Sequence, residues 1–197
     1  MGKFEEIDEL VASGNGYLKT TQVVDNGISK HTLASYVSER GMEKVAHGIY
    51  LSQDGWQDPY YELMLNNGRI IFSHESALYL HGLMEREPRK INVTVPAGYN
   101  ATHLRKKGVR VYQEKADVCS MGKDTVKTQY GNAVQAFDMD RTICDLIRRK
   151  QTVDVQVFQY AMKEYMKGKE KNIHNLMKYA KALGILDQVR TYTEVML

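Results

Sequence analysis

The chain has 197 residues, of which 43% are hydrophobic and 26% are charged, so it can bury one large core or two small ones. This composition excludes a chain that is disordered throughout. Lysine and arginine number 27 against 24 aspartates and glutamates, a net charge of +3. The charge is unevenly placed, because residues 1–55 carry a net −3 and residues 56–197 a net +6. The carboxyl-terminal part is therefore the basic part.

The sequence gives no sign of export, membrane insertion or metal binding. Cys119 and Cys144 fit no metal-ligand spacing and form no disulfide framework. The first ten residues are acidic where a secretory signal would be basic and apolar, and no apolar run reaches membrane-spanning length. We therefore expect a cytoplasmic protein that contacts no membrane and holds no metal or cofactor.

Three short helices are predicted near the N-terminus. Residues 4–11 place apolar side chains at helical spacing before the breaker Gly14-Asn15-Gly16. Residues 20–25 form a second helix, which we expect a threonine hydroxyl to cap and Asn26-Gly27 to end. Ser29 caps a third helix, whose inward positions are Leu33, Tyr36, Val37 and Arg40 and which Gly41 stops.

The third helix is followed at once by a predicted β-hairpin. Residues 43–51 are two β-favouring stretches around Gly48, and the polar loop 52–55 comes next. Two short helices and then a glycine-centred hairpin is the order of a winged helix-turn-helix, which binds DNA. We therefore expect residues 1–55 to be a DNA-binding domain. A protein-docking module of the same shape is the alternative, because this stretch is short of arginine.

The second part, residues 56–197, mixes helices and strands and then becomes wholly helical. We expect an α+β protein, in which the winged helix-turn-helix precedes a mixed α/β domain that ends in a helical bundle. The predicted helices of this part are 60–65, 75–80, 140–150, 153–167, 172–183 and 185–193, and the predicted strands are 69–72, 91–95, 109–112, 125–130 and 133–137.

DNA contacts in the first domain follow from the helical step of 100° per residue. With Leu33 and Val37 taken as the buried direction, His31 and Ser35 point away, and Thr32 flanks them. Lys30 lies in the first turn, and the start of the second helix can bind phosphate through hydroxyls and free N–H groups. The candidate contacts of this domain are Thr20, Thr21, Lys30, His31, Thr32, Ser35, Lys44 and His47.

The sequence resembles the AbiEi antitoxin family of bacterial abortive-infection toxin–antitoxin systems. The resemblance rests on the order of six stretches: Gly16–Thr20, Gly27–Leu33, Val45–Leu51, Ser73–Leu83, Val93–Pro96 and Asp140–Arg148. It implies an autorepressor that binds inverted repeats in its own promoter and counteracts a nucleotidyltransferase-like toxin without a stable complex. Family members often carry arginine beside the wing glycine, where this chain has His47, so the resemblance implies weaker or pH-sensitive wing contacts.

Two basic clusters lie in the second domain. Residues 86–115 carry a net +6, and residues 141–181 also carry a net +6. Clusters of this kind favour phosphate binding through counterion release. The run Arg148-Arg149-Lys150 is the candidate DNA contact, and a solvated helix face is the alternative.

Several acidic residues and a histidine raise the alternative that the protein is an enzyme. Asp138, Asp140 and Asp145, with His74 and Glu75, could form a metal or acid–base site. A plainer reading makes Asp138 or Asp140 a helix cap and pairs Asp145 with an arginine four residues away. We therefore expect no enzyme. The alternative function is a protein-interaction module that contacts or modifies a toxin, with the winged helix as a scaffold.

Overall fold

A computed structural model describes residues 2–196, with side chains described as far as residue 194. The chain forms two compact units. Unit 1 comprises residues 1–68 and 128–132, and unit 2 comprises residues 69–127 and 133–197. Both units combine helices with a sheet, which confirms the mixed α+β class. The predicted division of the DNA-binding domain from the rest after residue 55 stays a prediction, and residues 56–68 pack with unit 1.

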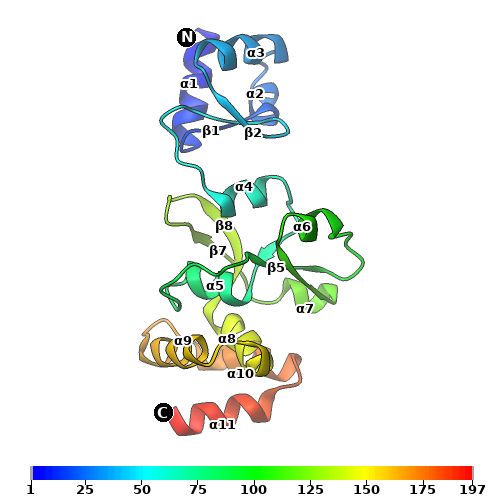
Figure 1. Cartoon of the computed structure of the whole chain (residues 1–197), viewed down its shortest axis with the longest axis vertical. Coiled ribbons are helices and arrows are strands. Elements are labelled where there is room, and N and C mark those ends of the chain that lie inside the picture. The colour runs from blue at the N-terminus through cyan, green and yellow to red at the C-terminus, as the bar shows by residue number, and fades with distance from the viewer. Residues whose placement is uncertain (1, 197) are drawn as a thin grey trace. The chain divides into compact units, whose positions relative to one another are not determined.

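Unit 1 contains helices and a small antiparallel sheet (Figure 1). The sheet has the strand order β1-β3-β2. Leu51 of the central strand β3 lies opposite Tyr17 of β1 on one side and opposite Glu43 of β2 on the other. A single apolar core joins α1, α2 and α3. In chain order the elements are α1 (Lys3–Ser13), β1 (Tyr17–Lys19), α2 (Thr20–Asp25), α3 (Lys30–Glu39), β2 (Glu43–Ala46), β3 (Ile49–Leu51) and α4 (Pro59–Leu65).

The ends of α2 and α3 agree with the sequence-based predictions, with one exception. Ser29 caps α3 by accepting from the amide of Thr32 at 3.1 Å. Gly27, after α2, has φ +75°, which is the left-handed conformation expected of a glycine at a helix end. The start of α2 differs from expectation, because no threonine caps it. Lys19 occupies the cap position, and its amide donates to the side chain of Gln22 at 3.2 Å.

Asp58 is a buried carboxylate that joins distant parts of unit 1. Its Oδ1 caps α4 by accepting from the amides of Tyr60 and Tyr61, each at 3.1 Å. Its Oδ2 accepts from the Thr128 hydroxyl and from Nδ2 of Asn132, the latter at 2.8 Å. The turn 128–132 is therefore fixed to α4 by charge-assisted hydrogen bonds.

Unit 2 contains a five-stranded mixed sheet with the order β6-β5-β4-β8-β7. The pairs β4–β5 and β7–β8 are antiparallel, and β5–β6 and β4–β8 are parallel. The short helices α6 and α7 were not anticipated from the sequence. The elements are β4 (Ile71–Phe72), α5 (His74–Leu80), β5 (Asn92–Pro96), α6 (Thr102–Lys106), β6 (Arg110–Glu114), α7 (Ala116–Ser120), β7 (Lys123–Lys127) and β8 (Ala133–Phe137).

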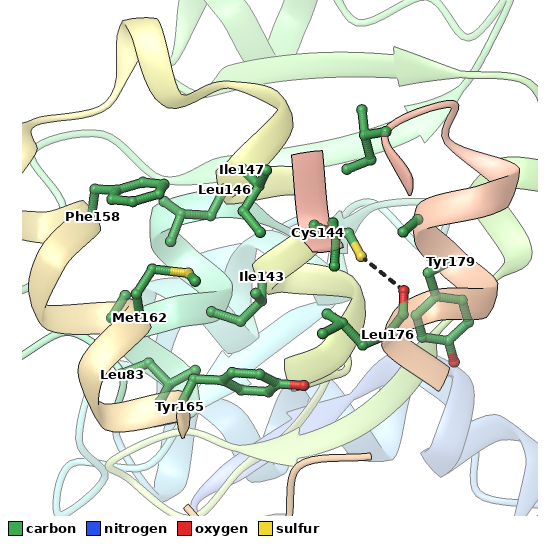
Figure 2. Close-up of a cluster of buried hydrophobic side chains, with 14 of the residues drawn as sticks. Leu83, Ile143, Cys144, Leu146, Ile147, Phe158, Met162, Tyr165, Leu176 and Tyr179 are labelled. Atoms are coloured by element: carbon green, nitrogen blue, oxygen red, sulfur yellow. Dashed lines mark hydrogen bonds between the residues drawn. The ribbon is translucent and has the colours of Figure 1, made fainter. Parts of the chain in front are cut away.

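Four helices and one short 3₁₀ turn complete unit 2. The core of this helical end forms around α8, whose residues from Asp140 to Ile147 are all buried. The Cys144 Sγ donates to the carbonyl of Leu176 on α10 at 3.4 Å, while Phe158 and Met162 of α9 cover α8 from another side (Figure 2). The elements are α8 (Met139–Arg148), η1 (Lys150–Thr152), α9 (Val155–Lys167), α10 (Ile173–Ala182) and α11 (Leu186–Met196). None of the helices within residues 2–196 is long and apolar enough to cross a bilayer.

Candidate nucleic-acid interface

The inner face of α3 is fixed by packing and by one carboxylate. Leu33 and Tyr36 are buried in the core that α3 shares with α1 and α2. The Tyr36 hydroxyl donates to Oδ1 of Asp8 on α1 at 2.6 Å, and Arg40 reaches the other oxygen of Asp8 at 2.9 Å. Burial, and then the hydrogen bond to Asp8, raise the pKa of Tyr36 to about 12. Arg40 is thus exposed and paired with Asp8 rather than inward, because a guanidinium that reaches a surface carboxylate avoids desolvation.

The outer face of α3 carries the predicted base-contacting residues. His31 and Ser35 are exposed, and Thr32 is half-buried. The Thr32 hydroxyl lies 2.9 Å from the Ser29 hydroxyl, and the Ser35 hydroxyl donates to the carbonyl of His31 at 3.3 Å. Each hydroxyl keeps acceptor capacity after these local bonds. The helix therefore presents small polar groups to solvent, as the pattern predicts, and whether they contact bases stays a prediction.

The start of α2 is tied to the β2–β3 hairpin. The amide of Thr20 donates to the carbonyl of Gly48 at 2.8 Å, so this N–H is not free for phosphate as the sequence had suggested. Gly48 has φ +68°, and a Cβ built there would lie 3.3 Å from the Thr20 hydroxyl, so glycine suits the hairpin turn. Thr21 and His47 are exposed beside this junction.

Unit 1 offers two unpaired cations near these groups. Lys30, the first residue of α3, and Lys44, on β2, are exposed, and neither forms an ion pair within the described part of the chain. They remain available to phosphate oxygens.

The run from Arg148 to Lys150 is exposed, but every member has a partner inside unit 2. Arg148 pairs with Glu114 at 2.6 Å. The guanidinium of Arg149 lies 5.2 Å from the centre of the Tyr112 ring. The Lys150 ammonium lies 5.6 Å and 5.2 Å from the rings of Phe158 and Tyr192, respectively. A DNA contact by this run stays a prediction, and it would have to compete with these interactions.

A second set of cations lies at the end of α6 and just after it. Leu104 is fully buried, and steps of 100° turn Arg105 and Lys106 away from it, while Lys107 follows at the end of the helix. These residues, Arg105, Lys106 and Lys107, are exposed and form no ion pair within residues 2–196. The sequence shows that these three residues are basic. It does not show whether they form ion pairs, because a local pattern gives no information about partners on distant strands.

The acidic residues once considered for catalysis have structural partners. Asp138 caps α8 by accepting from the amide of Arg141, and Asp145 pairs with the buried Arg141 guanidinium at 3.2 Å. Asp140 accepts from the hydroxyl of Tyr165 at 2.7 Å and from the amide of Asn172 at 3.0 Å. Both the predicted cap and the predicted i, i+4 pair with Arg141 are confirmed. Within the part of the chain that is described, no group of three histidine, cysteine or acidic residues could hold a metal ion.

His74 is buried and has a left-handed backbone, with φ +52°. Its ring stacks on Tyr112 with centroids 3.6 Å apart, and its Nδ1 lies 3.0 Å from the Ser73 hydroxyl. Burial, and then nearby arginines led by Arg149, lower the pKa of His74 to about 3. The imidazole is therefore neutral at physiological pH, and it holds the start of α5 against β6.

Comparisons with known proteins bear on the fold. No family model and no curated protein matches the sequence. The chain is similar in structure to the RV2827C protein from Mycobacterium tuberculosis. The TM-score is 0.56 at 11% sequence identity, and the match covers 95% of this chain and 78% of that one. At this identity the likeness concerns the fold alone, and it extends over both units.

Proposed function

We propose that this protein is a sequence-specific DNA-binding regulator, in which unit 1 is a winged helix-turn-helix and α3 is the recognition helix. The observation that carries the proposal is the two-sided character of α3. Its inner face is fixed to α1 through Tyr36 and Asp8, and its outer face presents His31 and Ser35 to solvent. The order of the helices and the β2–β3 hairpin is that of winged helices, whose second motif helix enters the major groove.

The resemblance to the AbiEi family extends this proposal to a biological role. The protein would repress its own promoter at inverted repeats, and it would counteract a nucleotidyltransferase-like toxin without forming a stable complex. The six stretches that carry the resemblance lie in both units, and the fold likeness to the RV2827C protein also extends over both. A neighbouring gene for such a toxin would support the role, and the absence of one would weaken it.

The DNA-binding proposal is tested by fluorescence anisotropy with the DNA upstream of the protein's own gene. The double variant H31A/S35A should lose specific affinity, on the scale of about 1–3 kcal/mol for each good base contact. The variant H174A removes an exposed histidine from α10 and should bind as the parent does. If H31A/S35A binds its promoter like the parent while K30A and K44A abolish binding, α3 is only a phosphate anchor.

Salt distinguishes this proposal from the alternative of a protein-docking scaffold. For a DNA-binding protein, the logarithm of the binding constant falls steeply and linearly with the logarithm of the salt concentration, because each neutralised phosphate releases counterions. A docking module should show no specific complex with promoter DNA that survives an excess of unrelated duplex.

A further inference from the structure

Unit 1 has an open pocket of about 640 Å³ that the DNA-binding proposal does not use. This volume is within the range of sites that hold small molecules or protein side chains. None of the predicted DNA contacts of unit 1 lines the pocket, so both could be occupied together. The lining residues come from the end of α1 and the turn after it, from the loop after β3, and from the turn 128–132.

The walls of this pocket are held in place by hydrogen bonds and by close packing. Asn15, with φ +53°, donates from Nδ2 to the carbonyl of Tyr130 at 2.7 Å and lies 3.2 Å from Oδ1 of Asn132. A Cβ at Gly55 would lie 2.4 Å from a methyl carbon of Leu51, so a larger residue there would force the buried Leu51 side chain to shift. Asn15 therefore holds the turn 128–132 against the end of α1 at one wall of the pocket.

The chemistry of the lining is aromatic and acidic. Trp56 is 76% exposed, and Tyr130 adds a second ring. Asp54 is the charged residue of the lining, and its carboxylate forms no ion pair or side-chain hydrogen bond within the described residues. Because Trp56 and Asp54 line the same pocket, a cation there would be attracted both by the quadrupole of the indole ring and by the charge of the carboxylate.

We propose that this pocket binds an arginine or lysine side chain that a partner protein presents. A protein fits better than a small amine, because Trp56 is exposed beyond what one cation would cover, and exposed tryptophans of this kind anchor protein interfaces. Residues 1–55 carry a net −3, to which the exposed Glu5 and Glu9 on α1 contribute. This charge would draw a basic surface toward the unit. The proposal is independent of the DNA-binding function.

The local chemistry is tested with the full-length protein and two matched peptides. One is an acetylated and amidated Gly-Gly-Arg-Gly-Gly, and the other carries citrulline in place of arginine. Trp56 is the only tryptophan, so its indole N–H resonance reports on the pocket. We expect saturable shifts with the arginine peptide, at least about tenfold weaker binding of the citrulline peptide, and a similar loss in D54N, as for one lost charged contact.

The control for this titration is E87Q, which removes an exposed carboxylate of unit 2 that does not line the pocket. It should bind the arginine peptide as the parent does. Equal shifts with both peptides, the absence of shifts at Trp56, or an equal loss in E87Q would overturn the proposal.

The protein partner is tested by photo-crosslinking in the native cells. A benzophenone amino acid replaces Gln129, an exposed residue of the lining, so that Trp56 and Asp54 are kept. In a control it replaces Val155, which is 65% exposed on α9. We expect position 129 alone to crosslink to another protein, at a peptide that mass spectrometry places beside an arginine or lysine. A crosslink to a second copy of this chain or to nucleic acid, or the same products from position 155, would overturn the proposal.

Discussion

Replacing Asp58 by alanine should lower the free energy of unfolding of unit 1 by about 4 kcal/mol. The carboxylate is fully buried and accepts four hydrogen bonds. Loss of the cap on α4 costs about 1 kcal/mol. The hydroxyl of Thr128 and the amide of Asn132 would each lose a charge-assisted hydrogen bond, at about 1.5 kcal/mol for each. This is a large share of the total stability of an ordinary domain.

Urea unfolding followed by the indole N–H resonance of Trp56 measures this effect in the unit where the carboxylate lies. With a slope of about 2 kcal/mol per molar urea, the midpoint of D58A should fall by about 2 M. The variant D58N keeps one acceptor for the cap but places a second donor against Asn132, so its midpoint should lie between those of D58A and the parent.

The matched control for D58A is D54A, four residues earlier. Asp54 is exposed and unpaired, so this variant should change the free energy of unfolding by no more than about 0.5 kcal/mol. If D58A shifts the urea midpoint no further than D54A does, the carboxylate does not hold the turn 128–132 to α4 and the reasoning is wrong.

Three other predictions concern charge and domain function. Burial raises the pKa of Asp145 to about 6, against the pull of Arg141, and the unfolded value is about 3.9. The folded state then binds the proton more tightly than the unfolded state, so the urea midpoint of the parent should fall from pH 4 to pH 6. The fall should be smaller in D145N, where only other buried carboxylates such as Asp138, whose pKa burial also raises, still contribute. If the protein binds DNA as proposed, glutamine at residues 105–107 should flatten the salt dependence of the binding constant by roughly one unit per lost phosphate contact. Glutamine at residues 148–150 should flatten it less, because those side chains already contact Glu114 and aromatic rings of unit 2. An equal effect of both triple variants would contradict this prediction. Under the proposed antitoxin function, a fragment of residues 56–197, which keeps Asp58 with Thr128 and Asn132, should lose operator binding yet still rescue toxin-expressing cells when supplied from an unrelated promoter. Failure of a folded fragment to protect would mean that DNA binding is part of the antidote.

Local rules placed much of unit 1 correctly from the sequence. The serine cap of α3 and the glycine after α2 depend on neighbours within a few residues, so their chemistry is visible in the chain itself. The buried positions of α3 follow from helical periodicity in the same way. In unit 2, the cap by Asp138 and the pair between Arg141 and Asp145 were also predictable for this reason.

Contacts between distant parts of the chain could not be predicted. Arg40 was placed inward by periodicity, but its partner Asp8 lies 32 residues earlier, on another helix. Arg148 likewise finds Glu114 on a strand 34 residues away. A basic run in a sequence therefore gives the sign of a surface but not the fraction of its charge that is free for a ligand.

The two-segment composition of unit 1 limits how this unit could be exchanged between proteins. A chimaera that joined residues 1–68 to a foreign domain would leave Asp58 without Thr128 and Asn132, and Asn15 without its partners in the same turn. Such a graft should express poorly unless it also carries the turn 128–132 on a hairpin at a suitable distance. Transfer of this unit to another protein by simple gene fusion is therefore disfavoured. A fluorescent tag inserted within the turn 128–132 should disturb unit 1, although the insertion point lies in the second half of the chain.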